Sequence, residues 1–315
     1  MSENELLFSL FFVSCRSKNK VEQPMIKDFD LLQRANNDYT TIDLEHAEEL
    51  AYRELIDSIR YIPLGDECGV MGNIANIITY KGRFYIQEEQ FDRVFIYDDT
   101  GRCLKKIDNK GRGPGEYLRI ESIDINTEKE ELMLVDGMSD KLFFYDLDGN
   151  FKSIHSIRYF QTENTLCLRD SVFLHISAPS QNFGNEGLYG YALVLSKGNE
   201  NFLKGYRYLP LQVGYKGGGQ IFKGYERSCY HPIYSDTIYQ ILSDTTYGPI
   251  FYFKIKNSSW EKYHNSDRFV DIDGSEEGVF TLLYENQDFF LGYIADKKKK
   301  GNYMQPFLYD KMKDK

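Results

Sequence analysis

The sequence contains an ungapped internal repeat with an offset of 48 residues. Residues 84–107 (FYIQEEQFDRVFIYDDTGRCLKKI) align with residues 132–155 (LMLVDGMSDKLFFYDLDGNFKSIH). A period of about 40 to 50 residues is typical of β-propellers and other stacked arrays, in which each repeat buries its faces against its neighbours. The repeat therefore predicts an all-β architecture built from stacked units. The aligned identities include Phe95 with Phe143, Tyr97 with Tyr145, Asp98 with Asp146 and Gly101 with Gly149.

The strands of this repeat carry hydrophobic side chains on both faces. In residues 93–98 (RVFIYD), Val94 and Ile96 point to one face, and Phe95 and Tyr97 point to the other. Strands with this pattern are buried on both sides. A propeller blade between two other blades meets this requirement, whereas a sheet with one solvent face would leave half of these groups in water.

Five such units are visible along the chain. The two clearest units cover residues 73–107 and 121–157, and we expect their strands at 74–80, 84–88, 93–97, 122–126, 132–136 and 141–145. More divergent units are expected near residues 160–207, 228–256 and 278–310. Before them, residues 41–63 are expected to contain an opening strand, a short helix and a strand at 59–64.

Composition and charge exclude some classes of function. The chain of 315 residues has 42% hydrophobic and 15% aromatic residues, which is enough to fill a large core. Its net charge of -10 argues against a nucleic-acid-binding protein, because no broad basic surface would neutralise phosphates. The basic run at residues 297–300 is interpreted as a solvated hairpin tip.

The N-terminus suggests export and a lipid anchor. Residues 6–13 (LLFSLFFV) are too few for a membrane-spanning helix of about 20 residues, but they fit the hydrophobic core of a secretion signal. Residues 12–15 (FVSC) resemble a bacterial lipobox, which implies a lipid on Cys15 as the only membrane attachment. We therefore expect a signal segment at 1–15, a polar tether at 16–40 and a propeller domain at 41–315. The alternative is an ordinary N-terminal segment, because the leader carries two acids and no basic residue.

The crossing between the first two units carries a family resemblance. Residues 110–117 (KGRGPGEY), together with residues 59–64 (IRYIPL), resemble the six-bladed β-propeller lipoproteins of Gram-negative envelopes, which have NHL-like repeats. The resemblance implies a six-bladed ring in an outer-membrane lipoprotein, and it implies no particular activity. Only five blades are visible, so we expect either that the C-terminal blade is missing or that N-terminal strands partly close the ring. The first is favoured, because residues 41–64 cannot supply four strands.

The same crossing contains the candidate ligand-binding residues. Its glycines do not follow the phosphate-loop pattern and no helix follows them, so we interpret them as a tight connection between blades. Arg112 and Glu116 either contact a ligand at the mouth of the ring or pair with neighbouring blades. Tyr117 belongs to the same loop. Tyr215, beside the glycines at 217–219, is a candidate for contact with a glycan.

No motif in the chain specifies a metal or cofactor site. The acidic turns at 98–101, 146–149 and 271–274 lack the further ligands of a calcium loop, and we interpret them as hairpin turns. Glu88 and Asp136 recur after equivalent strands, where we expect them to cap hairpins or bond between blades. The cysteines show no metal-binding spacing, and Cys103 is expected to pack within a strand.

These observations favour a non-enzymatic binding protein of the cell envelope. Its partner would be a glycan, a peptide or an envelope protein at the mouth of the propeller, with no cofactor and no nucleic acid. The alternative is a hydrolase or lyase that acts on a sugar or peptide in the central channel, although the five scattered histidines form no HExxH and no GxSxG is present. A third reading is a sensory domain that passes a signal to a membrane partner.

Overall fold

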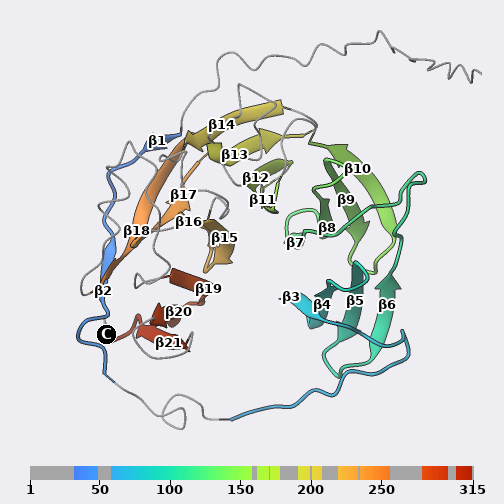
Figure 1. Cartoon of the computed structure of the whole chain (residues 1–315), viewed down its shortest axis with the longest axis horizontal. Helices are drawn as coiled ribbons and strands as arrows, with labels where there is room; N and C mark the ends of the chain where they lie inside the picture. The colour runs from blue at the N-terminus through green and yellow to red at the C-terminus, as the bar shows by residue number, and fades with distance from the viewer. Residues whose placement is uncertain are drawn as a thin grey trace, which may run out of the picture.

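The computed structural model describes residues 32–48, 58–157, 162–169, 171–177, 191–198, 201–207, 219–232, 235–243, 245–255, 279–296 and 303–313. These residues form five β-sheets that are arranged as the blades of a propeller around a common axis (Figure 1). No helix is present in these ranges. Cys15, Tyr215, the short helix predicted before residue 59, the turn at 271–274 and the basic run at 297–300 lie outside them.

Blades one and two are the two copies of the 48-residue repeat. Each is a four-stranded antiparallel sheet whose strands follow in sequence order, and the predicted strands are confirmed to within a residue. Blade one contains β3 (Ile74–Tyr80), β4 (Arg83–Glu88), β5 (Arg93–Asp98) and β6 (Cys103–Ile107). Blade two contains β7 (Ser122–Asn126), β8 (Glu131–Asp136), β9 (Lys141–Asp146) and β10 (Phe151–Ser156).

The other three blades follow the same order, with one difference from the prediction. Blade four begins at Gly219 and not near residue 228, because the last of the three glycines already pairs with Pro232. Blade three contains β11 (Asn164–Arg169), β12 (Val172–Ile176), β13 (Tyr191–Lys197) and β14 (Asn201–Arg207). Blade four contains β15 (Gly219–Gly224), β16 (Arg227–Pro232), β17 (Thr237–Ile241) and β18 (Thr246–Lys254). Blade five contains β19 (Val279–Glu285), β20 (Phe289–Asp296) and β21 (Tyr303–Asp310).

Two N-terminal strands extend blade four. Both β1 (Gln33–Arg34) and β2 (Thr40–Asp43) pair in parallel with the outer strand β18, as Figure 1 shows on the left of the ring. Leu32 and Ile42 are buried in the hydrophobic clusters beside this blade, which anchors the segment. These strands therefore do not close the ring between blades five and one. The described residues form five blades, and a six-bladed ring stays a prediction.

The hydrophobic core lies between neighbouring blades. Val94, Phe95, Ile96 and Tyr97 are all fully buried, which confirms that β5 is covered on both faces. The cluster between blades one and two joins Val94 and Ile96 to side chains of β7, β8 and β9. Burial of one such side chain contributes about 1.5–3 kcal/mol to folding, so each blade depends on its neighbours for stability.

Residues 59–72 cover the outer part of blade one. Residues 59–64 were predicted to be a strand, but they form none, and Arg60, Ile62 and Pro63 lie against the turn at 98–101 instead. Cys68 and Met71 pack with Phe95 and Tyr97, and Cys68 forms a disulfide with Cys103. Cys103 therefore lies in a strand as expected, but it is also a disulfide partner, which the sequence reasoning missed.

The disulfide is expected to contribute about 2–4 kcal/mol to stability, because it closes a long loop in the unfolded chain. A Cys68→Ser and Cys103→Ser double variant should show this loss in urea unfolding followed by fluorescence. A reductant should lower the stability of the parent protein to that of the variant and leave the variant unchanged. Equal stability of the oxidised parent and the variant would contradict the pairing.

Candidate functional site

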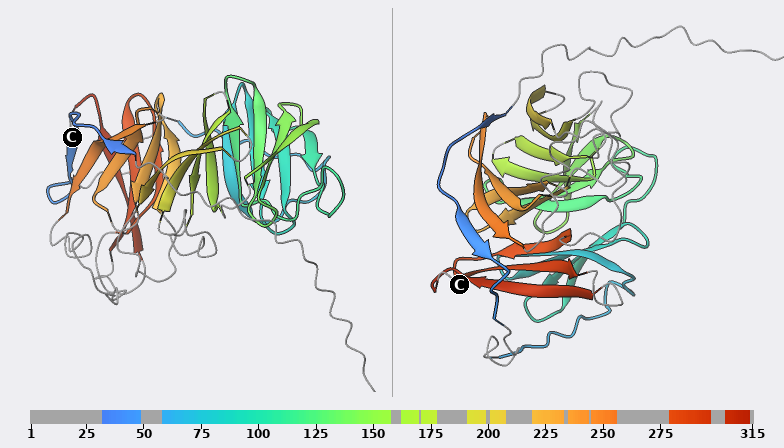
Figure 2. Two further views of the ribbon diagram at one scale, coloured as in Figure 1. Left: turned by 90° about the horizontal axis from the view of Figure 1, so that it is seen from above. Right: turned by 60° about the vertical axis from the view of Figure 1, so that its left-hand side comes forward.

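The two ends of the ring differ in the connections that they carry. Because strands in a blade alternate in direction, the hairpins β4–β5 and β8–β9 lie at one end together with the crossings between blades. We call this the crossing end. The hairpins β3–β4 and β7–β8 and the turns at 98–101 and 146–149 lie at the other end, the turn end. Figure 2 shows the blades from the side.

Polar groups at the turn end are paired between blades. Lys81 forms an ion pair with Glu130 of the next blade. Arg83 Nη1 lies 2.7 Å from Asp148 Oδ1, which again links blade one to blade two. The acidic turns bind their own backbone, as when Asp98 Oδ1 accepts N–H donors of Thr100 and Arg102 at 3.0 and 3.1 Å. These contacts at the turn end of blades one and two are therefore structural.

The predicted crossing connects blade one to blade two and is fixed by Tyr117. This side chain is fully buried, with its ring 6.0 Å from that of Phe143 in an edge-to-face contact. Its hydroxyl donates to the carbonyl of Asp92 at 2.8 Å and accepts the backbone N–H of Asn109 at 3.1 Å. Burial raises the pKa of Tyr117. Tyr117 anchors the loop and presents no surface to a ligand in this structure.

Glu116 and Arg112 lie on the exposed part of the same loop. Glu116 Oε2 accepts the backbone N–H of Gly113 at 2.7 Å, and its carboxylate fills the space that a Cβ atom at Gly111 would need. These contacts explain why glycine occupies the loop. The guanidinium of Arg112 is exposed and has no polar partner among the described residues. It is free to bind a carboxylate or a phosphate group from outside.

Two equivalent acidic residues cap the hairpins at the crossing end, as predicted. Asp136 accepts hydrogen bonds from the backbone of Leu118, Met138 and Ser139 at 2.7–3.1 Å. Glu88 accepts the backbone N–H groups of residues 90 and 91 in the same way. Because backbone donors occupy these carboxylates, they support hairpin structure and the connection between blades.

Further carboxylates gather beside these caps. Asp92 forms an ion pair with Lys110 of the crossing and accepts the N–H of Ile120 at 3.1 Å. Burial raises the pKa of Glu121, and the neighbouring carboxylates of Asp92 and Asp136 add to the shift. The crossing thus bridges the two hairpins, since Lys110 contacts the first and Leu118 contacts the second.

The tips of these two hairpins expose hydrophobic side chains. Phe91 and Met138 are 45% and 65% exposed, and each lies in the hairpin that its blade presents at the crossing end. The guanidinium of Arg93 lies 4.6 Å from the centre of the Phe91 ring, which holds that ring in place. Exposed methionine, aromatic and arginine side chains are enriched at binding interfaces. Phe91 and Met138 at the hairpin tips are thus candidate contact residues. Arg112 is a third candidate on the crossing loop, where a Cβ atom at Gly115 would lie 3.9 Å from the ring of Phe151. We call these three residues the crossing patch.

A serine, a histidine and a threonine form a hydrogen-bonded chain inside blade three. His175 Nδ1 lies 2.9 Å from Thr165 Oγ1, and His175 Nε2 lies 2.7 Å from Ser196 Oγ. All three side chains are fully buried, and burial lowers the pKa of His175 to about 3. This arrangement of three side chains resembles a catalytic triad, but it is buried and no substrate reaches it in this structure. The two hydrogen bonds satisfy polar groups within the core.

The two free cysteines within the described ranges are also buried. Burial raises the pKa of Cys167 to about 12 and that of Cys229 to about 12. The thiolate is the reactive form of cysteine, so neither side chain is suited to nucleophilic chemistry at neutral pH.

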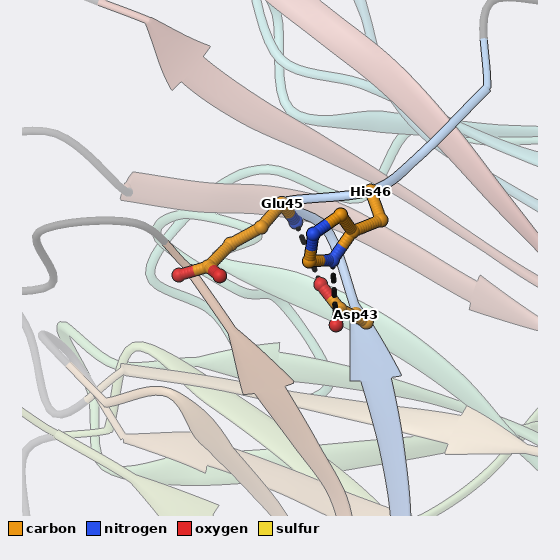
Figure 3. Close-up of side chains that lie close together, drawn as sticks. All are labelled: Asp43, Glu45 and His46. Carbon is orange, nitrogen blue, oxygen red and sulfur yellow. Dashed lines mark hydrogen bonds and ion pairs between the residues drawn. The ribbon is translucent and has the colours of Figure 1, made fainter.

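One exposed group of three residues with metal-ligand side chains lies among the described residues, at the end of β2 (Figure 3). His46 Nδ1 is 3.0 Å from Asp43 Oδ2, and Lys254 Nζ is 3.0 Å from the same oxygen and 3.2 Å from Glu45 Oε2. The hydrogen bond with His46, followed by that with Lys254, lowers the pKa of Asp43 to about 2. The ammonium group already compensates the two carboxylates, so this group is a surface ion cluster that fastens β2 to β18.

Comparison with known families identifies the chain. A domain of unknown function, DUF4934, matches residues 39–315. The chain belongs to the DUF4934 family. None of the curated proteins matches it. The described residues of this DUF4934 protein include no helix with the length and hydrophobicity that a membrane crossing requires.

Solved structures show the same fold. A "putative exported protein" from Bacteroides fragilis NCTC 9343 superposes with a TM-score of 0.71 at 18% identity, over 88% of this chain and 79% of that chain. U3-55K matches more weakly, with a TM-score of 0.45 at 10% identity, over 74% of this chain and 68% of that chain. A DUF4221 member from Bacteroides vulgatus ATCC 8482 has a TM-score of 0.37 at 8% identity, over 76% of this chain and 82% of that chain. At these identities the first match supports the propeller fold and no activity.

Proposed function

We propose that this DUF4934 protein is an exported, non-enzymatic binding protein of the cell envelope that contacts a peptide or protein through the crossing patch. The observation that carries the proposal is the exposed, unpaired guanidinium of Arg112, in contrast to the paired cations between blades one and two. At the turn end, cations such as Lys81 and Arg83 are paired between blades. The exposed Arg112 has no polar partner among the described residues, and its loop bridges the hairpins of Phe91 and Met138 through Lys110 and Leu118.

Two observations support export. A disulfide such as Cys68–Cys103 forms and persists in oxidising compartments and is rare in the cytosol. The similar structure from Bacteroides fragilis carries the name "putative exported protein". We further propose that Cys15 carries the lipid anchor of an outer-membrane lipoprotein, and that the ring has six blade positions, of which the described residues fill five.

The composition of the crossing patch selects the partner. A guanidinium pairs best with a carboxylate, while Phe91 and Met138 offer hydrophobic contact. A peptide segment that combines an acidic residue with hydrophobic residues satisfies both requirements. A neutral glycan would leave the charge of Arg112 unused, so a polypeptide is favoured over the glycan alternative.

Binding of the full chain to an array of acidic-hydrophobic peptides tests the proposal. An Arg112→Glu variant is expected to lose at least about tenfold in affinity, since it places like charges together. An Arg102→Glu variant at the turn end is the matched control and should bind as the parent does. Equal losses in both variants, or no binding by the parent, would contradict the proposal.

Metabolic labelling with a lipid analogue tests the anchor, because Cys15→Ala should abolish the label.

A further inference from the structure

The outer strands of blades one and two face each other across a junction at the outside of the ring. Ile96 and Tyr145 belong to the hydrophobic cluster between these blades. Lys105 on β6 pairs with Ile96, and Phe151 on β10 pairs with Tyr145. Residues that lie opposite each other in a sheet share a face, so Lys105 and Phe151 point into the junction from its two sides. We call the region lined by Lys105, Phe151 and the loop at 111–116 the outer junction.

Phe151 is exposed although its ring is held in place. The residue is 46% exposed. Its ring lies 5.7 Å from that of the buried Tyr145 in an edge-to-face contact. The loop approaches the ring with Gly115, where a Cβ atom would lie 3.9 Å from the ring and where φ is +81°, a conformation that glycine adopts without strain. The loop therefore borders the ring of Phe151 and leaves part of it uncovered.

The equivalent position of blade one is covered. The 48-residue repeat places Cys103 where blade two has Phe151. In blade one, the segment before the inner strand is bonded to this position by the disulfide between Cys68 and Cys103, and Cys103 is partly buried. In blade two, the segment before the inner strand approaches Phe151 with Gly115 instead. An exposed aromatic ring thus occupies a position that the first repeat covers, which favours a role in contact with another molecule.

Two cations without partners lie beside Phe151. The stem of Lys105 lies against Gly149, two residues before Phe151, where a Cβ atom at Gly149 would be 2.9 Å from Lys105 Cγ. Arg112 lies three residues before Gly115 in the loop that borders the ring. Both side chains are exposed, and neither charged group has a polar partner among the described residues. Neighbouring cations are neutralised in the pairs Lys106–Asp108, Lys110–Asp92 and Lys152–Glu131.

We propose that the outer junction binds an aromatic residue of the partner polypeptide on Phe151, while acidic residues of the same segment pair with Lys105 and Arg112. This inference rests on the proposed function and adds the residues that select the partner's sequence. Two uncompensated cations favour a segment with two carboxylates. Aromatic rings prefer edge-to-face or offset contact with another ring, which the exposed and fixed ring of Phe151 offers. Side chains two positions apart share a face of an extended segment, so we expect acidic residues two positions before and after the aromatic residue.

Binding of the full chain to a fluorescent peptide tests this inference. The peptide carries one phenylalanine, with a glutamate two positions before it and another two positions after it. Phe151→Ala and Lys105→Glu are each expected to weaken binding at least about tenfold. Leu104→Ala is the matched control, because Leu104 is 39% exposed on the same strand as Lys105 and is directed to the opposite face. Circular dichroism establishes that the variants fold, which is expected because the replaced side chains are exposed.

A change on each side of the contact separates direct contact from an indirect effect. Replacing the phenylalanine of the peptide with alanine is expected to weaken binding to the parent at least about tenfold, and to the Phe151→Ala variant less than about twofold, because that contact is already lost. Independent losses would overturn the inference. If Arg112→Glu weakens binding and Phe151→Ala does not, the proposed function stands and this inference is wrong. If neither variant weakens binding, both are wrong. Binding of polygalacturonate in place of the peptide would also overturn the inference, because the ligand would then be an acidic polysaccharide.

Discussion

Removal of both cations that contact Glu285, in an Arg227→Met and Lys311→Met double variant, is expected to lower the free energy of unfolding by about 3–5 kcal/mol. The Glu285 side chain is fully buried, with Arg227 Nη2 2.7 Å and Lys311 Nζ 2.6 Å from its Oε1 atom. Without these partners, a buried carboxylate would lack compensation. Urea unfolding of the full chain measures the loss.

This buried group joins blade four to blade five. Arg227 begins β16, Glu285 ends β19 and Lys311 follows β21, so the three residues link two sheets at the turn end. The N–H of Tyr225 also donates to Glu285 Oε2 at 3.2 Å. A side chain at Gly224 would collide with this carboxylate, which explains the glycine. The loss should therefore appear as detachment of blade five, measurable by faster hydrogen exchange in β19–β21.

A third substitution tests the cause of the loss. Adding Glu285→Gln to the double variant removes the buried charge and is expected to recover at least about 1 kcal/mol. Lys254→Met is the surface control, since Lys254 pairs with exposed Asp43 and should cost less than about 1 kcal/mol. A double variant within about 1 kcal/mol of the parent would show that the cations do not compensate Glu285.

The fold was predictable from the sequence where the pattern is local. Strands such as residues 93–98 carry hydrophobic groups on both faces, and that pattern requires a neighbour on each side. The prediction failed where pairing is distant in sequence. Thr40 pairs with Phe251, and no local feature of residues 40–43 indicates that partner. The start of blade four was missed because three successive glycines indicate a loop, while the last of them pairs with Pro232.

The structural roles of residues in the site were only partly predictable from the sequence. Hairpin caps such as Asp136 were predictable because the repeat places them after equivalent strands. The hydrogen bonds among Thr165, His175 and Ser196 were not predictable. The register of the hairpins brings His175 to Thr165 and Ser196, which are 10 and 21 positions away in the sequence. The disulfide was missed for a similar reason, because its cysteines are separated by 35 residues and only the folded chain brings them close.

Acidification from pH 6.5 to about 4.5 is expected to remove roughly 5 kcal/mol of stability through two buried histidines. Burial lowers the pKa of His175 to about 3 and that of His231 to about 4. In the unfolded chain both have a pKa near 6.5. Between the folded-state and unfolded-state pKa values, the unfolded state binds two more protons than the folded state. The contribution of the two neutral histidines to stability is therefore fully present above about pH 6.5, and it is lost as the pH is lowered. The slope approaches about 3 kcal/mol per pH unit, shared about equally by the two histidines.

Substitution separates the contribution of the histidines from that of the carboxyl groups. His175→Gln and His231→Gln are each expected to reduce the slope by about half, since glutamine can replace the hydrogen bonds to Ser196 or to the carbonyl of Ser235 without binding a proton. His46→Gln, which removes an exposed imidazole, is the control for the substitution itself. Burial also raises the pKa of Asp124, which opposes the loss equally in the parent and the variants, so the difference between their slopes is the quantity compared. An unchanged slope in both buried-histidine variants would mean that these rings are already protonated in the folded protein, and the neutral hydrogen-bonded chain in blade three would then be wrong.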